Sequence, residues 1–114
     1  MPLTDWSDSI VIAELSDEPS FSEDLDALQT RLEDNAREGK VPDVILNLQA
    51  VTYLNSSNIA QLLRLRKKLI ITNRRLRICS VNDSVWSVML TTGLDAVFNF
   101  TDDVSTSLAS LHLA

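Results

Sequence analysis

The sequence contains very few of the residues on which enzyme chemistry depends. Among 114 residues there are two glycines, one cysteine (Cys79) and one histidine (His112). Two glycines leave little room for a glycine-rich loop that cradles phosphate groups, and none is present. No Ser-His-Asp, Cys-His or metal-ligand set can be assembled around a lone histidine near the end of the chain. We therefore expect a protein that is not an enzyme and that uses neither a cofactor nor a metal ion.

The single cysteine also bears on the cellular compartment. It cannot form an intramolecular disulfide, so nothing in the sequence indicates an oxidising environment. Because Cys79 falls in a predicted buried strand, we expect a small hydrophobic side chain and not a nucleophile. A basic N-terminal segment is missing, and no stretch approaches the roughly 20 apolar residues that span a bilayer. We expect a cytoplasmic protein that is neither secreted nor inserted into a membrane.

The sequence has fewer basic residues than acidic ones. The chain has 10 Lys and Arg against 16 Asp and Glu, a formal net charge of -6. A general nucleic-acid binder needs Lys and Arg across a whole face, so DNA and RNA are excluded as expected partners. Residues 1–48 hold 12 acids and 3 bases, whereas residues 49–114 hold 4 acids and 7 bases. All seven of these bases lie in the segment from Arg64 to Arg77. They form either a solvated helix end or a docking face for an acidic partner.

Length and composition suit one compact domain. With 45% hydrophobic residues, a chain of this length fills one core but not two. We predict a single domain over residues 1–114, in which residues 1–8 form an N-terminal arm. Trp6, which lies on that arm, is predicted to be a packing residue.

Short apolar runs rich in β-branched residues predict four buried strands. They cover residues 10–15, 44–48, 76–81 and 97–100. Apolar residues at helical spacing predict four helices between and after these strands. The helices run from Ser20 to Gly39, from the cluster 55–58 to Asn73, from about Asp83 to Gly93, and from the capping segment 101–103 through Leu111.

The predicted helix boundaries depend on residues that favour helix ends. Ser20 and Glu23 have the spacing of a capping box, and Asn55 opens a cluster of N-capping residue types. Gly39 and Gly93 can adopt the positive φ that commonly ends a helix. Strands that alternate with helices predict an α/β fold, a small mixed β-sheet of about four to five strands packed with about four helices.

One stretch of the sequence resembles a known family. Residues 44–58 read Val-Ile-Leu-Asn-Leu-Gln-Ala-Val-Thr-Tyr-Leu-Asn-Ser-Ser-Asn. This is similar to the signature of STAS domains, the family of anti-sigma factor antagonists, in which a buried strand ends in Asp-Ser-Ser/Thr-Gly at a helix start. Residues 92–94, Thr-Gly-Leu, are similar to a second family motif, and the resemblance extends from about Ile10 to Leu111. It implies a STAS-type single-domain fold.

The resemblance also implies a regulatory binding function. In that bacterial family, a partner that is both a serine kinase and an anti-sigma factor phosphorylates the serine after the aspartate. By position, that serine is Ser56. The unmodified form binds the kinase and frees a sigma factor for transcription, the phosphorylated form lets go, and a phosphatase resets the switch. The chain thus resembles an anti-sigma factor antagonist that acts by partner switching.

The partner-binding residues that the resemblance implies are Asn55, Ser56, Ser57, Asn58, Gln61 and Arg64. Two of them depart from the family pattern, because Asn55 stands where the family usually has Asp and Asn58 where it usually has Gly. Asn keeps an oxygen that can cap backbone N–H groups but loses the carboxylate charge. Asn also tolerates left-handed backbone angles better than most residues, which suits a position usually held by Gly.

These departures keep other functions open. The main alternative is a phosphorylation-independent STAS protein-interaction module in a transport or signalling assembly. A third hypothesis, a small-ligand or nucleotide binder, depends on analogy with some family members. Trp86 is either an exposed anchor for a partner or a core residue.

Overall fold

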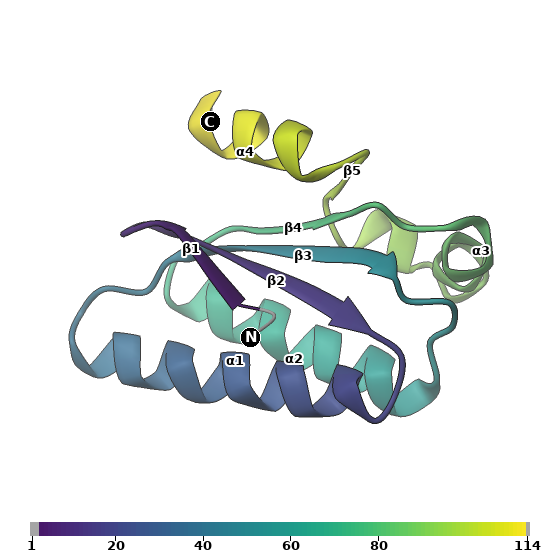
Figure 1. Ribbon diagram of the computed structural model, residues 1–114, viewed down its shortest axis with the longest axis horizontal. Coiled ribbons are helices and arrows are strands. Elements are labelled where there is room, and N and C mark those ends of the chain that lie inside the picture. Colours follow the sequence, from purple (N-terminus) through teal and green to yellow (C-terminus); the bar gives the residue numbers. More distant parts are fainter. Residues whose placement is uncertain (1–2, 114) are drawn as a thin grey trace.

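The computed structural model describes residues 3–113, which form one five-stranded sheet with helices on both of its faces (Figure 1). The strands are β1 (Leu3–Ser7), β2 (Ile10–Ser16), β3 (Asp43–Ala50), β4 (Leu76–Cys79) and β5 (Phe100–Thr101). The helices are α1 (Ser20–Arg37), α2 (Ser56–Ile71), α3 (Asp83–Thr92) and α4 (Val104–Leu113), with a short 3-10 helix, Leu94–Ala96, after α3.

The sheet is mixed, as predicted. Its strands lie in the order β1-β2-β3-β4-β5, with β1 antiparallel to β2 and the other neighbours parallel. Val11 pairs with Val44, and Leu46 pairs with Ile78. Because alternate residues of a strand face opposite sides, this register places one apolar set from each central strand on the same face.

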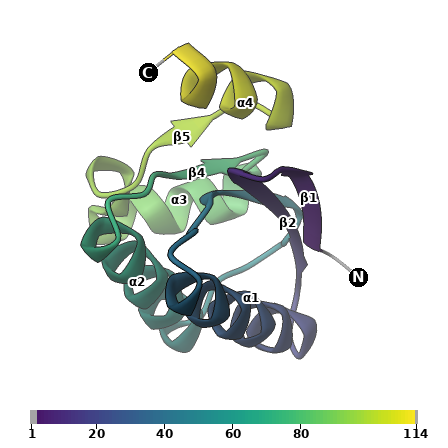
Figure 2. The same cartoon turned by 90° about the vertical axis from the view of Figure 1, so that its left-hand side faces the viewer.

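The larger core lies between the sheet and the helices α1, α2 and α3. Figures 1 and 2 show α1 and α2 side by side under the sheet, with α3 on the same side next to β4. The buried residues of the two long helices recur at intervals of three or four, which is the helical period. They include Leu25, Leu28, Leu32, Leu62, Leu65 and Leu69. This face of the sheet thus holds the strands and α2 in fixed relative positions.

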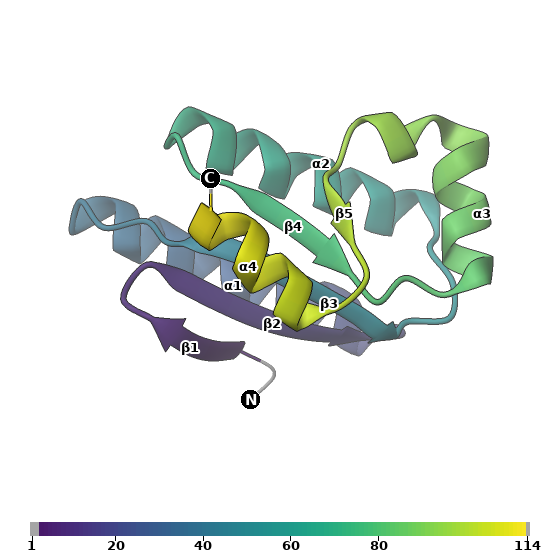
Figure 3. The ribbon, with the colours of Figure 1, turned by 90° about the horizontal axis from the view of Figure 1, so that it is seen from above.

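The smaller core lies on the opposite face, where α4 crosses the sheet (Figure 3). Leu111 of α4 packs there with Ile10, Ile12, Ile45 and Cys79. Burial raises the pKa of the Cys79 thiol, because the charged thiolate is disfavoured away from water. The prediction that Cys79 is a buried hydrophobic side chain is confirmed.

The N-terminal segment differs from its predicted form. Residues 1–8 were predicted to form an arm; residues 3–7 of this segment form β1, which pairs with β2 at the edge of the sheet. The strand register shifts between Asp5 and Ser7, and the intervening Trp6 is 60% exposed. The prediction that Trp6 packs against the core is therefore wrong.

Two strand ends also differ from prediction. The strand predicted over residues 76–81 ends at Cys79, because Ser80 adopts a φ of 59°, outside the extended region. The strand predicted over residues 97–100 is displaced to β5, Phe100–Thr101. Phe98 instead follows the 3-10 helix, donates its N–H to the carbonyl of Leu94 and packs into the larger core.

The predicted capping box between Ser20 and Glu23 does not form, since neither residue caps α1. The carboxylate of Glu18 performs that function. It accepts hydrogen bonds from the Ser22 N–H at 2.6 Å and from the Ser22 hydroxyl at 2.7 Å. These bonds lower the pKa of Glu18, and a carboxylate at this helix end is also favoured by the helix dipole.

Leu28→Ala should lower the free energy of unfolding by about 2–5 kcal/mol, because it leaves a cavity in the larger core. Ile70→Ala is the matched control. Ile70 is 55% exposed on α2, so its truncation should change stability by less than about 0.5 kcal/mol. Chemical denaturation followed by circular dichroism measures both values; equal losses would contradict the assignment of the core.

Candidate functional site

Three loops meet at the carboxyl edge of the parallel strands. They are residues 17–19 after β2, residues 51–55 after β3, and residues 80–82 after β4. Parallel neighbouring strands end at the same edge of a sheet, so the loops that leave them lie close together. The middle loop carries the predicted site into the first turn of α2.

The middle loop is fastened on both sides. Asp17 accepts hydrogen bonds from the Thr52 N–H at 2.8 Å and from the Thr52 hydroxyl at 2.6 Å. On the other side, the Asn82 side-chain amide donates to the carbonyl of Val51. The bonds from Thr52 lower the pKa of Asp17, the hydroxyl having the largest effect. The backbone that leads into α2 is thus held to both neighbouring loops.

Asn55 and Asn58 cap α2 reciprocally. The Asn55 Oδ1 accepts the Asn58 N–H at 2.8 Å, and the Asn58 Oδ1 accepts the Asn55 N–H at 3.1 Å. This is a complete capping box built from two asparagines. Asn58 lies in the helix and is not among the residues with positive φ. Tolerance of left-handed angles is therefore not used at this position, and the amide caps the helix instead.

Two of the predicted partner-binding residues lie beneath the surface. Asn58 is 1% exposed and Gln61 is 7% exposed. The Gln61 Oε1 accepts from the Ser22 hydroxyl at 3.3 Å and from the Asn58 Nδ2 at 3.5 Å. Buried polar groups need such partners. These two side chains support the site from inside, which corrects their predicted role as contact residues.

The other four predicted residues, Asn55, Ser56, Ser57 and Arg64, are exposed. The first N–H groups of a helix have no intrahelical partner and carry a partial positive charge, so the exposed serines occupy a position that suits an anion. Tyr53 lies three positions before Ser56, the first residue of α2, and is 48% exposed. Tyr53 is not among the predicted contact residues, although an aromatic residue just before a polar capping cluster is a usable signal for one.

The basic run from Arg64 to Arg77 does not form one face. Lys68 makes an ion pair with Glu33 of α1, and Arg75 makes one with Asp43 at 2.9 Å. Arg66 and Arg77 donate to a backbone carbonyl and to a serine hydroxyl, respectively. Neither of the two predicted descriptions, a solvated helix end or a docking face, fits these four bases, because their side chains join separate elements.

Trp86 is half-buried and combines features of both predictions made for it. Its ring meets the ring of Phe100 edge-on, with the centroids 5.1 Å apart. It also lines a hollow of about 260 Å³ together with Val81 and Asp102. One part of the ring is therefore a packing surface, and another part borders open space.

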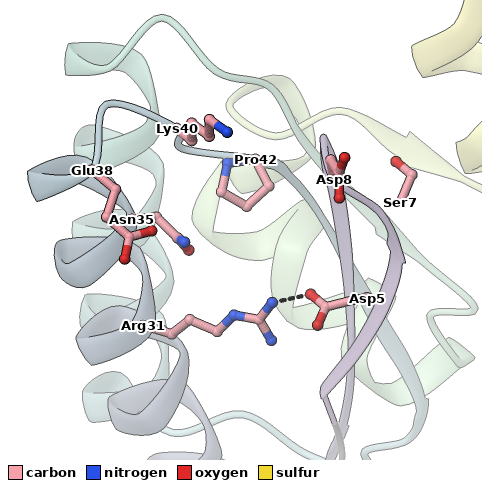
Figure 4. Close-up of a pocket in the computed structure, with 8 residues that line it drawn as sticks. All are labelled: Asp5, Ser7, Asp8, Arg31, Asn35, Glu38, Lys40 and Pro42. Carbon is pink, nitrogen blue, oxygen red and sulfur yellow. Dashed lines mark hydrogen bonds and ion pairs between the residues drawn. The ribbon is translucent and has the colours of Figure 1, made fainter.

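A hollow of about 410 Å³ lies at the opposite edge of the sheet from the serines. Figure 4 shows it between α1 and the turn that joins β1 to β2, with the ion pair of Arg31 and Asp5 across it. Among residues 3–113, no group of three or more His, Cys, Asp or Glu is arranged to hold a metal ion. No helix in the same part of the chain is long and apolar enough to cross a membrane.

Comparisons with known proteins agree with the observed fold. The STAS domain family model matches residues 3–107. Among solved structures, TM1081 of Thermotoga maritima has a TM-score of 0.76 at 18% identity, covering 97% of this chain and 93% of that one. A variant of RsbS from Moorella thermoacetica has a TM-score of 0.77 at 12% identity, with 98% and 96% covered. Phosphorylated SpoIIAA of Bacillus, a cell fate determinant, has a TM-score of 0.69 at 13% identity, with 96% of each chain covered. No curated protein matches this chain in sequence.

Thr52→Val should destabilise the protein in a pH-dependent way. The Thr52 hydroxyl holds the pKa of Asp17 below its ordinary value of 3.8, so its contribution is complete above that pH and is lost as the pH falls through the folded-state pKa. The difference in unfolding free energy between the variant and the parent should shrink as the pH falls below 3.8. Denaturation series at several pH values measure it; a difference that does not vary with pH would contradict the role of the bond.

Asn55→Ala should lower the free energy of unfolding by about 1 kcal/mol, because it removes the cap of α2. Asn55→Asp should preserve stability above the carboxyl pKa, since a carboxylate accepts the same N–H bond and interacts favourably with the helix dipole. Thermal and chemical denaturation of both variants distinguish the two effects. Equal destabilisation by Ala and Asp would show that the side-chain oxygen does not cap the helix.

Proposed function

The chain belongs to the STAS domain family, and from that premise we propose that it is an anti-sigma factor antagonist-like regulatory protein of the bacterial cytoplasm. It binds a protein partner that is both a serine kinase and an anti-sigma factor. The contact surface is the exposed start of α2, and phosphorylation of Ser56 releases the partner until a phosphatase restores the unmodified form.

The observation that carries this proposal is the placement of Ser56. It occupies the position of the phosphorylated serine in the family pattern, and its side chain is exposed at the first residue of α2. A kinase can reach a hydroxyl only on an accessible segment, and loops held by a rigid scaffold are common binding sites. The fastened loop and the reciprocal Asn55–Asn58 cap provide that scaffold.

The surface around Ser56 has the chemistry of a protein interface. Tyr53 supplies an exposed aromatic ring, and Leu63 supplies an apolar side chain that is 38% exposed. Leu63 and Arg64 lie seven and eight residues after Ser56, on the same side of the helix. Aromatic and arginine side chains are enriched at protein interfaces and among the residues that contribute most to binding.

Phosphorylation would act at the interface and leave the fold intact. A phosphate adds about -1.5 to -2 charges, and the start of α2 offers free N–H groups and the positive end of the helix dipole. Asn55 is neutral, so the capping residue does not repel that charge. The partner, packed against the same surface, meets new bulk and negative charge and is released.

The second candidate is a phosphorylation-independent interaction module in a transport or signalling assembly. The observation that favours it is that Asn55 and Asn58 replace the usual Asp and Gly and bond to each other. A closed cap of two neutral amides holds α2 without any charge. Such a module would keep the same binding surface and bind constitutively.

Phosphosite mapping by mass spectrometry on protein recovered from its native cells, under growth and under stress, tests the switch. We expect phosphate on Ser56 that changes with conditions. The responsible kinase should phosphorylate the Ser57→Ala variant and fail to phosphorylate the Ser56→Ala variant. Its affinity for the Ser56→Glu variant should be at least about tenfold weaker than for the parent protein, because a buried like charge costs several kcal/mol.

An unmodified protein under every condition would contradict the switch. If, in addition, Ser56→Glu binds its partner as tightly as the parent does, the phosphorylation-independent module is the function. Loss of partner binding in Tyr53→Ala, with stability unchanged, would still locate the contact surface at the start of α2.

A further inference from the structure

Four arginines of the basic run line one hollow away from the serines. The hollow has a volume of about 160 Å³, well above the roughly 10–15 Å³ that a single water needs on the same measure. Its arginines come from the second half of α2, from the segment after it and from β4. They are Arg66, Arg74, Arg75 and Arg77, and Phe98 and Asn99 line the hollow with them.

The shortness of β5 explains the hollow. β5 pairs with β4 only at Ile78 and Cys79, so no strand lies on the outer side of the first half of β4, opposite β3. Residues 97–99 pass there instead, joined to β4 by the hydrogen bond from the Ile78 N–H to the Asn99 carbonyl. The outer edge of β4 therefore borders a space that side chains of the basic run surround.

Two of these arginines are held by uncharged groups. Arg66 donates its Nε–H to the carbonyl of Val97 at 3.2 Å. Arg77 donates its Nε–H to the Ser110 hydroxyl at 2.9 Å and an Nη–H to the carbonyl of Leu76 at 3.2 Å. A guanidinium has five N–H donors in a planar fork, so these bonds fix the side chains and leave donors over. The arginines are positioned without being neutralised.

The charge around the hollow is unbalanced. Asp43 makes an ion pair with Arg75 at 2.9 Å and also accepts its backbone N–H. The structure shows no ion pair for Arg66, Arg74 or Arg77 within residues 3–113, and no carboxylate lines the hollow. Burial and the neighbouring Arg75 lower the pKa of Arg77, and the charge of Asp43 acts in the opposite direction. A cluster of like charges of this kind is stabilised by an anion.

We propose that this hollow is a binding site for the phosphate group of a small soluble molecule. Guanidinium forks bind phosphate oxygens in pairs, and a tetrahedral oxyanion can accept bonds from several directions at once. The exposed Ile70 and the half-buried Val97 at the hollow give an attached organic group an apolar surface to contact. The site is separate from the start of α2, so it does not depend on phosphorylation of Ser56.

Nuclear magnetic resonance of the arginine Nε–H groups tests the site, with inorganic phosphate and phenyl phosphate as the two probes at matched ionic strength. We expect saturable shifts at Arg66 and Arg77. Arg74→Gln should weaken binding about tenfold, the loss of one charge-assisted contact. Arg74 is exposed, so this change should not affect folding. Lys67→Gln, a change of an exposed base that lies outside the hollow, is the matched control and should bind as the parent does.

Tighter binding of phenyl phosphate would identify a phosphate ester as the ligand, and tighter binding of inorganic phosphate would identify the free ion. Shifts that do not saturate, or equal weakening by Lys67→Gln and Arg74→Gln, would show general screening by counterions and overturn the proposal. A positive result leaves the partner switch untested, and a negative result leaves it unaffected, because the two sites share no residue.

Discussion

The arrangement of the site depends on one constraint, the fixed position of the loop between β3 and α2. Parallel strands bring three loops to one edge of the sheet, and the outer two each bond to the middle one. The carboxylate of Asp17 accepts hydrogen bonds from the backbone N–H and the hydroxyl of Thr52. The side-chain amide of Asn82 donates to the carbonyl of Val51. Because these bonds join different crossover units, the start of α2 cannot move without breaking contacts on both sides.

The residues of the site divide into buried ones that support the loop and exposed ones that a partner can contact. Asn58 and Gln61 are buried and bond within the protein, so they set the geometry of the first turn of α2. The side chains of three neighbouring residues are exposed at the surface above these buried groups: Tyr53, Ser56 and Ser57. A modification of an exposed side chain on such a support changes the surface that a partner meets and leaves the core intact. The proposed switch therefore needs no conformational change in this chain.

The sequence predicted well those features that depend on local pattern and poorly those that depend on contacts between residues far apart in the chain. The buried central strands and the caps at Asn55 and Gly93 follow from apolar periodicity and helix-end chemistry. The mixed sheet followed from the family resemblance and the alternation of strands and helices, and the position of Ser56 at a helix start followed from the resemblance. The hydrogen bonds from Arg66 to the Val97 carbonyl and from Arg77 to the Ser110 hydroxyl could not be predicted, because each joins residues more than thirty positions apart in the chain. Similarly, no local signal showed that Glu18, rather than Ser20, would cap α1.

Amide hydrogen exchange of residues 51–58 tests most directly the claim that the serine is presented on a preformed support. The N–H groups of Thr52 and Asn58 are hydrogen-bonded to side chains, whereas the first N–H groups of α2 have no intrahelical partner. The account predicts that Thr52 and Asn58 exchange slowly and that Ser56 and Ser57 exchange fast in the free protein. Equally fast exchange at all four positions would contradict it, because the loop would then be mobile until a partner orders it.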